Sequence, residues 1–210
     1  MTAPSRVRLG LGFLVFMLST AAPAQTVASL DAGPGDRDAG SIDRDGGYVY
    51  RLPYRDGESY TVIQGYGSPL SHRGSEYYTI DFGMPPGTLV LSAREGRVER
   101  TEDRYDRSCW SGRCARYANF VEIRHSDGTL GRYFHLQQGG VMVQPGQWVE
   151  RGQPIARSGD TGYSNAPHLH FGVYETLGEG VDQSIAVRFA VRGGYVGRLR
   201  AGARYLSPED

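Results

Sequence analysis

Two histidines alternate with apolar residues in the segment Pro167-His168-Leu169-His170-Phe171. Successive side chains of a strand point to opposite faces, so we expect His168 and His170 on one face and Leu169 and Phe171 in a core. Two neighbouring imidazoles pack poorly, but they are well placed to bind a metal ion. Because a His-x-His pair is weak evidence by itself, its meaning depends on the side chains that the fold brings to it.

An aspartate embedded in an apolar strand is the second chemical signal. Asp81 stands between Ile80 and Phe82, where an ionised carboxylate is costly to desolvate unless a cation or hydrogen-bond donors receive it. A zinc ion held by His72, Asp81 and His170 would supply that cation. Three protein ligands with an open fourth position form the catalytic rather than the structural type of zinc site.

The two remaining histidines lie at the ends of predicted strands. In Tyr133-Phe134-His135-Leu136, strand alternation predicts Phe134 and Leu136 on one face and His135 with Tyr133 on the other. His125 follows the apolar strand positions 121 and 123 and precedes the turn Ser126-Asp127-Gly128. We interpret His125 as a structural histidine beside a turn.

The elements that must position these side chains are short strands rich in Val, Ile, Tyr, Phe and Thr, separated by turn dipeptides. The expected strands are 60–64, 77–82, 88–92, 97–101, 115–125, 129–136, 148–150, 155–158, 168–175 and 184–189. No segment has helical periodicity over 11 residues. We therefore predict an all-β fold of antiparallel sheets packed face to face, forming a groove with the metal site on its floor.

Composition excludes several classes of protein. Glycine provides 30 of the 210 residues, about twice the usual ~7 %, which argues against a helical bundle. The 23 basic residues, all arginine, balance 23 acidic residues, so electrostatics does not indicate a nucleic-acid binder. No apolar run reaches the ~18 residues that a membrane-spanning helix needs. The sequence does not indicate an oligomeric state.

The first part of the chain resembles an export signal. Arg6 and Arg8 precede an apolar stretch over 9–18 and the small residues Ala22-Pro23-Ala24, which predicts a signal peptide over 1–24 and an exported protein, periplasmic or extracellular. Residues 25–47 are rich in Asp, Gly and Arg and are predicted to be a disordered linker. An Asp-rich calcium loop would need a terminal bidentate glutamate, which is missing. The folded domain is expected over 48–210.

Cys109 and Cys114 are the two cysteines of the chain, and they flank a short polar loop. In an exported protein they are expected to form a disulfide across a hairpin tip. A redox-active pair is disfavoured because the spacing is not Cys-x-x-Cys, and a structural zinc site would need two more soft ligands nearby.

Four sequence blocks together resemble the lysostaphin-like, or LytM-type, zinc metallopeptidases that cut peptidoglycan peptides. The resemblance covers most of the folded domain, from about residue 60 to residue 175. The blocks, in chain order, are Ser71-His72 with Ile80-Asp81-Phe82, Pro86-Gly87-Thr88, Tyr133-Phe134-His135-Leu136, and Gly159-Asp160-Thr161-Gly162 leading into Pro167-His168-Leu169-His170-Phe171.

The resemblance implies a role for each motif residue. It implies zinc ligation by His72, Asp81 and His170, and catalysis by His135 and His168, one as general base and the other supporting the oxyanion or the leaving amine. Tyr66 would match a transition-state tyrosine of some members.

The chain departs from the family pattern at two positions. Eight residues separate His72 from Asp81 where the commonest spacing is His-x-x-x-Asp, which we interpret as a loop extension over 73–77. Gly172 stands where many members have a glutamate.

We therefore expect a secreted zinc-dependent endopeptidase that acts on the peptides of bacterial peptidoglycan. A second hypothesis is a non-catalytic module of the same type that binds the cell wall or activates an amidase. A third is a general secreted protease, which has the same chemistry and differs in substrate.

Overall fold

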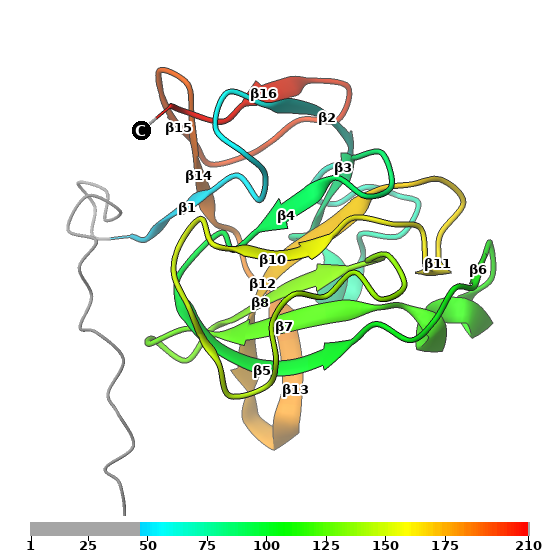
Figure 1. Ribbon diagram of the computed structural model, residues 1–210. Coiled ribbons are helices and arrows are strands. Elements are labelled where there is room, and N and C mark those ends of the chain that lie inside the picture. Colours follow the sequence, from blue (N-terminus) through cyan, green and yellow to red (C-terminus); the bar gives the residue numbers. More distant parts are fainter. Residues whose placement is uncertain (1–46, 210) are drawn as a thin grey trace, which may run out of the picture. The chain divides into compact units, whose positions relative to one another are not determined.

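The computed structural model describes residues 47–209, which fold as strands joined by turns (Figure 1). The helices in this part of the chain are three short 3-10 turns, η1 (Gly74–Glu76), η2 (Gly112–Tyr117) and η3 (Gly178–Gly180). No helix within residues 47–209 is long and apolar enough to cross a membrane. The predicted signal peptide and almost all of the predicted linker lie outside the described residues.

A nine-stranded antiparallel sheet forms the centre of the fold and carries the site. Its strands, from one edge to the other, are β16 (Arg204–Leu206), β2 (Ser59–Gln64), β3 (Ile80–Gly83), β12 (Leu169–Leu177), β8 (Leu130–Phe134), β7 (Phe120–Arg124), β5 (Gly96–Glu102) and β9 (Trp148–Val149). The ninth strand, β13 (Val181–Ser184), pairs with the second half of β12. The predicted antiparallel all-β fold is confirmed.

Three smaller sheets surround the central sheet. The strand β4 (Leu89–Leu91) pairs antiparallel with β10 (Pro154–Arg157), and this pair lies in front of β12 and β8 in Figure 1. The strand β14 (Arg188–Val191) lies between β1 (Val49–Arg51) and β15 (Gly194–Val196). The strand β6 (Ser108–Cys109) pairs with β11 (Gly162–Tyr163). Two of these pairings, β1 with β14 and β6 with β11, are parallel, and each joins segments far apart in the chain.

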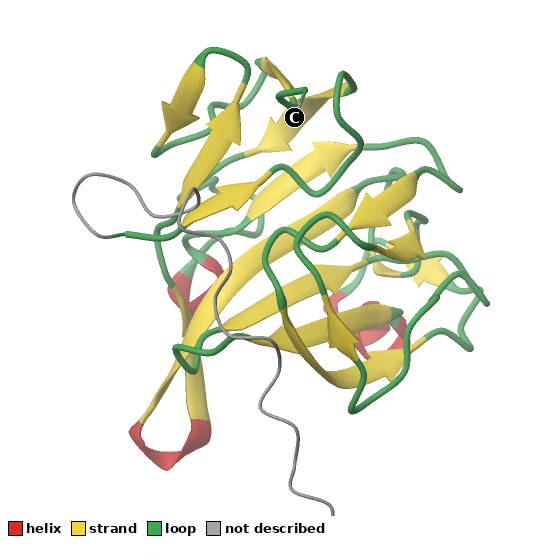
Figure 2. Cartoon of the chain, turned by 60° about the vertical axis from the view of Figure 1, so that its left-hand side comes forward, coloured by secondary structure: helices red, strands yellow, loops and turns green. Residues whose placement is uncertain are grey.

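The core lies between the central sheet and the β4–β10 pair. Val90 and Ile155 from that pair belong to the same buried cluster as Phe82, Tyr133 and Phe171 from the sheet. Figure 2 shows the layered arrangement of the strands. Burial of these apolar side chains fixes which face of each central strand turns away from the core, and that opposite face carries the site.

Some strand boundaries differ from the sequence-based expectations. The strand expected at 115–125 begins at Phe120, because residues 112–117 form η2, whose first turn is capped by the Ser111 hydroxyl accepting from the Arg113 amide. The strand expected at 77–82 begins at Ile80. The β12–β13 hairpin was missed because its tip is rich in glycine and its apolar residues Leu177 and Val181 are exposed, so no alternation of polar and apolar residues marks it.

Cys109 and Cys114 form a disulfide with an S–S distance of 1.99 Å. The predicted pairing is therefore confirmed. The expected hairpin tip is wrong, because the bond joins β6 to η2 rather than two paired strands.

Candidate metal centre and active site

Side chains from three neighbouring strands, β2, β3 and β12, form one polar row across the central sheet. His170 on β12 lies directly opposite Asp81 on β3 and, on its other side, opposite Phe134 on β8. Asp81 in turn lies opposite Gln64 on β2. Because Leu169 and Phe171 point into the core, His170 between them points to the other face, as strand alternation predicts.

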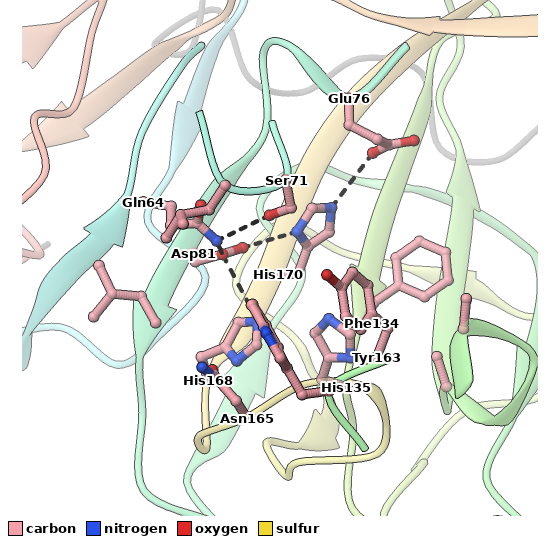
Figure 3. Close-up of a pocket in the computed structure, with 15 residues that line it drawn as sticks. Gln64, Ser71, Glu76, Asp81, Phe134, His135, Tyr163, Asn165, His168 and His170 are labelled. Atoms are coloured by element: carbon pink, nitrogen blue, oxygen red, sulfur yellow. Dashed lines mark hydrogen bonds and ion pairs between the residues drawn. The ribbon is translucent and has the colours of Figure 1, made fainter. Parts of the chain in front are cut away.

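The polar row lies at a groove of about 610 Å³. Most of the groove wall is apolar, and Figure 3 shows His135, His168, His170 and Asp81 directed into it. The lining residues are Ile63, Gln64, Leu70, Ser71, Glu76, Asp81, Trp110, Ala115, Ala118, Phe134, His135, Tyr163, Asn165, His168 and His170.

The structure brings together the three residues that the sequence nominated as metal ligands. One ligand atom each from His72, Asp81 and His170 lies within 4.8 Å of the others. The Asp81 Oδ1 atom is 3.2 Å from His72 Nε2 and 2.8 Å from His170 Nδ1. His72 and Asp81 are almost completely buried, so water does not compensate their polar atoms.

Hydrogen bonds on the outer side of each ring indicate which nitrogen is free. The His72 Nδ1–H donates to the Gly65 carbonyl at 3.0 Å, which leaves the Nε2 lone pair facing the Asp81 carboxylate. Nε2 of His72 has no hydrogen-bond partner among the described residues. The His170 Nε2 lies 3.5 Å from the Glu76 carboxylate. On the other side of the ring, the His170 Nδ1 lies 2.8 Å from Asp81 Oδ1. Two ring nitrogens and a carboxylate oxygen therefore converge, and a cation or a proton among them would balance the charge of the carboxylate.

The pKa shifts of Asp81 and His170 also indicate that the Asp81 carboxylate is balanced by positive charge. Burial raises the pKa of Asp81, but its interactions with His170 and His72 outweigh this effect and hold that pKa well below its usual range. Burial lowers the pKa of His170, yet its contacts with Asp81 and Glu76 raise that pKa to about 9. A proton on His170 thus supplies the positive charge when no cation does. A His-Asp-His set with neutral imidazoles fits a divalent ion such as zinc.

His135 and His168 lie beside the three converging side chains. Their ring centroids are 4.5 Å apart, and the His135 ring is 5.9 Å from that of His170. The His135 Nδ1–H donates to the Thr161 carbonyl at 2.6 Å, and the His168 Nδ1–H donates to the Ala166 carbonyl at 2.8 Å. In the neutral form of either ring, Nε2 is therefore the nitrogen that can accept a proton. Burial, together with the neighbouring histidines, lowers the pKa of His135 to about 3, so this ring is neutral.

The orientation of His135 differs from the sequence-based expectation. Tyr133 is in the core and Phe134 lines the groove, but His135 does not return to the core face with Tyr133. Its φ is 64°, the one positive φ of a non-glycine residue within 47–209. This backbone conformation ends the strand alternation and turns the ring into the groove, and Leu136 enters the core instead.

Gln64 is a site residue that the sequence analysis missed. Its Nε2 donates to Asp81 Oδ2 at 2.6 Å, which leaves Asp81 Oδ1 for His72 and His170. The register between β2 and β3 shifts between Val62 and Gln64, as at a β-bulge. Ile63 and Gln64 consequently both line the groove, which regular alternation does not predict.

Tyr66 does not occupy the site. Its hydroxyl donates to the Val187 carbonyl and accepts from the Val187 amide, each at 3.2 Å, and its ring belongs to the core. Burial raises the pKa of Tyr66 to about 12. The expectation of a transition-state tyrosine at this position is therefore wrong in this structure.

His125 lies apart from the other histidines, as predicted. It is buried, and its Nδ1–H donates to the Glu95 carbonyl at 2.7 Å. Its ring packs edge to face with Tyr50, 5.8 Å between centroids, and does not line the groove.

Comparison with known proteins gives a family match across the site. The profile of peptidase family M23 matches residues 75–183, which include Asp81, His135, His168 and His170. The match begins after His72. The position of His72 beside Asp81 therefore comes from the structure.

Several characterised proteins are similar to the chain over about half of its length. Lysostaphin of Staphylococcus simulans is 38% identical over 115 residues, which cover 54% of this chain and 21% of that protein. Peptidoglycan DD-endopeptidase ShyA of Vibrio cholerae is 36% identical over 103 residues, 49% of this chain and 21% of that protein. The chain thus spans about a fifth of these two relatives.

Among solved structures, the catalytic domain of lysostaphin from S. simulans aligns with a TM-score of 0.43 and 32% identity. This alignment covers 62% of this chain and 88% of that domain.

Proposed function

The chain belongs to peptidase family M23, and from this premise we propose that it is a secreted zinc-dependent endopeptidase that hydrolyses peptide bonds in bacterial peptidoglycan. The observation that carries the proposal is the convergence of His72 Nε2, Asp81 Oδ1 and His170 Nδ1 within 4.8 Å at the groove. The names of the relatives, a peptidoglycan endopeptidase and lysostaphin, support the class of substrate. Export is supported by the sequence of residues 1–24.

His72, Asp81 and His170 would hold the zinc ion. When bound, zinc supplies Lewis-acid activation of water and of the peptide carbonyl. Gln64 holds Asp81 through Oδ2, and Gly65 fixes the tautomer of His72, so both ligands are oriented before the metal binds.

His135 and His168 would carry the proton transfers of hydrolysis. Each ring donates Nδ1–H to a backbone carbonyl and keeps Nε2 as an acceptor. One ring takes a proton from the attacking water as its oxygen bonds to the carbonyl carbon. The C–N bond then breaks, and a proton passes to the leaving amine.

The apolar groove wall favours a peptide substrate whose side chains near the cleaved bond are uncharged. Ile63, Leu70, Trp110, Phe134 and Tyr163 present apolar surface around the histidines. Outside the metal cluster, Glu76 is the one charged side chain among the lining residues. Small or aliphatic substrate side chains suit such a surface.

The test is digestion of purified cell-wall material with the protein, followed by identification of the released fragments by mass. We expect new amino termini, loss of cleavage after chelation, and recovery after zinc is added. The His170→Ala variant should be inactive. Full activity of that variant would contradict the proposal, and cleavage of proteins but not of wall material would favour the general protease.

The alternative function, a wall-binding or amidase-activating module without catalysis, makes a different prediction for the same protein. Such a module would bind wall material without releasing fragments and would purify without zinc. The complete set of candidate ligands and the two neighbouring histidines favour the enzyme.

A further inference from the structure

Two features of the chain are not explained by metal ligation alone. Eight residues separate His72 from Asp81, and Gly172 follows the His-x-His segment on β12. Strand alternation places Gly172 on the same face as His170 and Tyr174, so it lies next to the site. In the structure the extension carries Glu76, and Gly172 lies against Tyr174, whose hydroxyl contacts the Glu76 carboxylate.

Glu76 lies at the end of η1, within the segment that separates the two ligands. Its backbone carbonyl accepts hydrogen bonds from the Thr79 amide at 3.2 Å and from the Thr79 hydroxyl at 2.7 Å. Gln183 on β13 donates to the Gly74 carbonyl at 3.1 Å and ties the same turn to the sheet. The turn that carries Glu76 is therefore attached to the central sheet.

The Glu76 side chain faces the outer edge of the His170 ring. Its Oε2 lies 3.5 Å from His170 Nε2, while His170 Nδ1 on the other side of the ring lies 2.8 Å from Asp81 Oδ1. Figure 3 shows His170 between these two carboxylates, with a contact to each. A proton on Nε2 directed at Glu76 leaves the Nδ1 lone pair directed at Asp81.

Tyr174 contacts the Glu76 carboxylate, and the absence of a side chain at Gly172 leaves space for the tyrosine ring. The buried Tyr174 hydroxyl donates to Glu76 Oε2. A Cβ atom at position 172 would lie 2.7 Å from Thr79 Cγ2, 2.9 Å from Tyr174 Cε2 and 3.1 Å from the Tyr174 hydroxyl. A side chain at 172 would require Thr79 or the Tyr174 ring to shift from the position that places the tyrosine hydroxyl against Glu76.

We propose that Glu76 is the positioning residue of the metal site, accepting Nε2–H of His170 so that Nδ1 is held unprotonated toward Asp81. Metal-binding histidines commonly donate their second ring N–H to a carboxylate, which fixes the tautomer and increases the basicity of the ligand. In this chain the loop extension carries that carboxylate, and Gly172 and Tyr174 keep it in place. The inference rests on the proposed zinc site.

The experiment measures zinc affinity of the metal-free protein by competition with a chromophoric chelator. Glu76→Gln should weaken zinc binding by about 10- to 100-fold. Tyr174→Phe, which keeps the ring and removes the hydroxyl, should weaken it by roughly 2- to 10-fold. The matched control is Glu175→Gln, which removes the same charge from an exposed position on β12, the strand of His170, and should leave zinc affinity unchanged.

Two further measurements separate positioning from a structural role. The visible absorption spectrum of the cobalt-substituted protein should change in Glu76→Gln and not in Glu175→Gln, because cobalt reports the geometry of its ligands. Thermal unfolding of the metal-free proteins should give similar midpoints for both variants and the unchanged protein.

The outcomes distinguish the inference from the function on which it rests. If the unchanged protein binds no zinc, the proposed function fails and the inference fails with it. If the unchanged protein binds zinc and Glu76→Gln binds it equally well with the same cobalt spectrum, the inference alone is overturned. A lower unfolding midpoint with unaltered zinc affinity would also overturn it, since Glu76 would then be purely structural.

Discussion

His72 and His125 are both buried, and both donate Nδ1–H to a backbone carbonyl, at 3.0 Å from Gly65 and 2.7 Å from Glu95. In both rings Nε2 has no hydrogen-bond partner among the residues that the structure describes. The difference lies in what Nε2 faces. For His72 it is Asp81 Oδ1 at 3.2 Å, and for His125 it is Gly131, where a Cβ atom would lie 2.9 Å away.

This difference shows what makes a buried histidine a candidate ligand. The anchoring hydrogen bond is the same in both regions, and it orients either ring equally well. Only at His72 does the fold place a carboxylate and a second imidazole next to the free nitrogen. The groups next to the free Nε2, rather than residue type or burial, distinguish the region of the metal site around His72 from the structural region around His125.

The largest expected effect comes from removing the Asp81 carboxylate from the metal site. Asp81→Asn keeps the size of the side chain but removes the charge that pairs with a cation, so zinc should be lost and peptide cleavage should fall by at least about 1,000-fold. The measurements are zinc content of the purified protein and cleavage of wall material. Asp127→Asn, near His125, is the matched control and should retain zinc, and equal zinc content in the two variants would contradict the comparison.

The second prediction compares a histidine from each region. His135→Gln should reduce kcat by about 100- to 10,000-fold with zinc retained, because the Nε2 acceptor in the groove is lost. His125→Gln should leave the turnover of the folded protein unchanged. The measurement is peptide cleavage per zinc-loaded molecule, and a loss of kcat in His125→Gln of similar size would remove the distinction.

The third prediction concerns how the stability of the protein changes in acid through His125. Burial lowers the pKa of His125 to about 4, whereas an unfolded histidine has a pKa near 6.5. Between these values the unfolded chain binds a proton that the folded protein excludes. The contribution of the neutral His125 ring to the free energy of unfolding is therefore complete above about pH 6.5. It is lost as the pH falls toward 4, about 3 kcal/mol in all.

Urea unfolding of the metal-free protein at pH 7 and pH 4.5 measures this effect. His125→Gln should lose less free energy of unfolding over this interval than the unchanged protein, and the difference isolates His125 from the other groups that titrate. Equal losses in the two proteins would show that this ring is not kept neutral by burial.

The smallest expected effect uses a glycine from each region. Gly131→Ala places a methyl group against His125 Nε2 and should lower the free energy of unfolding by about 1 to 3 kcal/mol, without changing zinc affinity. Gly172→Ala places one against Thr79 and Tyr174 and should weaken zinc binding as well. Unfolding curves and chelator competition on both variants give the comparison, and a change in zinc affinity in Gly131→Ala would contradict it.

Two of the three candidate ligands, Asp81 and His170, could be predicted from the sequence because their signals are local. His170 alternates with buried residues on one strand, and Asp81 is a charge within an apolar strand. Such patterns follow from strand geometry and from the cost of burying a charge, and neither depends on distant parts of the chain. The same holds for the disulfide, whose two cysteines are five residues apart.

Other features of the site depend on distant contacts and could not be predicted. Gln64 reaches Asp81 because of a register shift between two strands. Tyr66 is held away from the groove by Val187, 121 residues along the chain. Neither the bulge nor the contact with Val187 has a recognisable pattern at the residue concerned.

The sequence by itself determined the strand-rich class of the fold and the chemistry of its ligands, because side-chain type and a two-residue period are properties of short segments. Only the tertiary structure decided that His135 turns into the groove with a φ of 64°, and that Glu76 faces His170. Both depend on hydrogen bonds to residues distant in sequence, Thr161 for His135 and Tyr174 for Glu76. Such contacts exist only after the strands have paired and the core has packed.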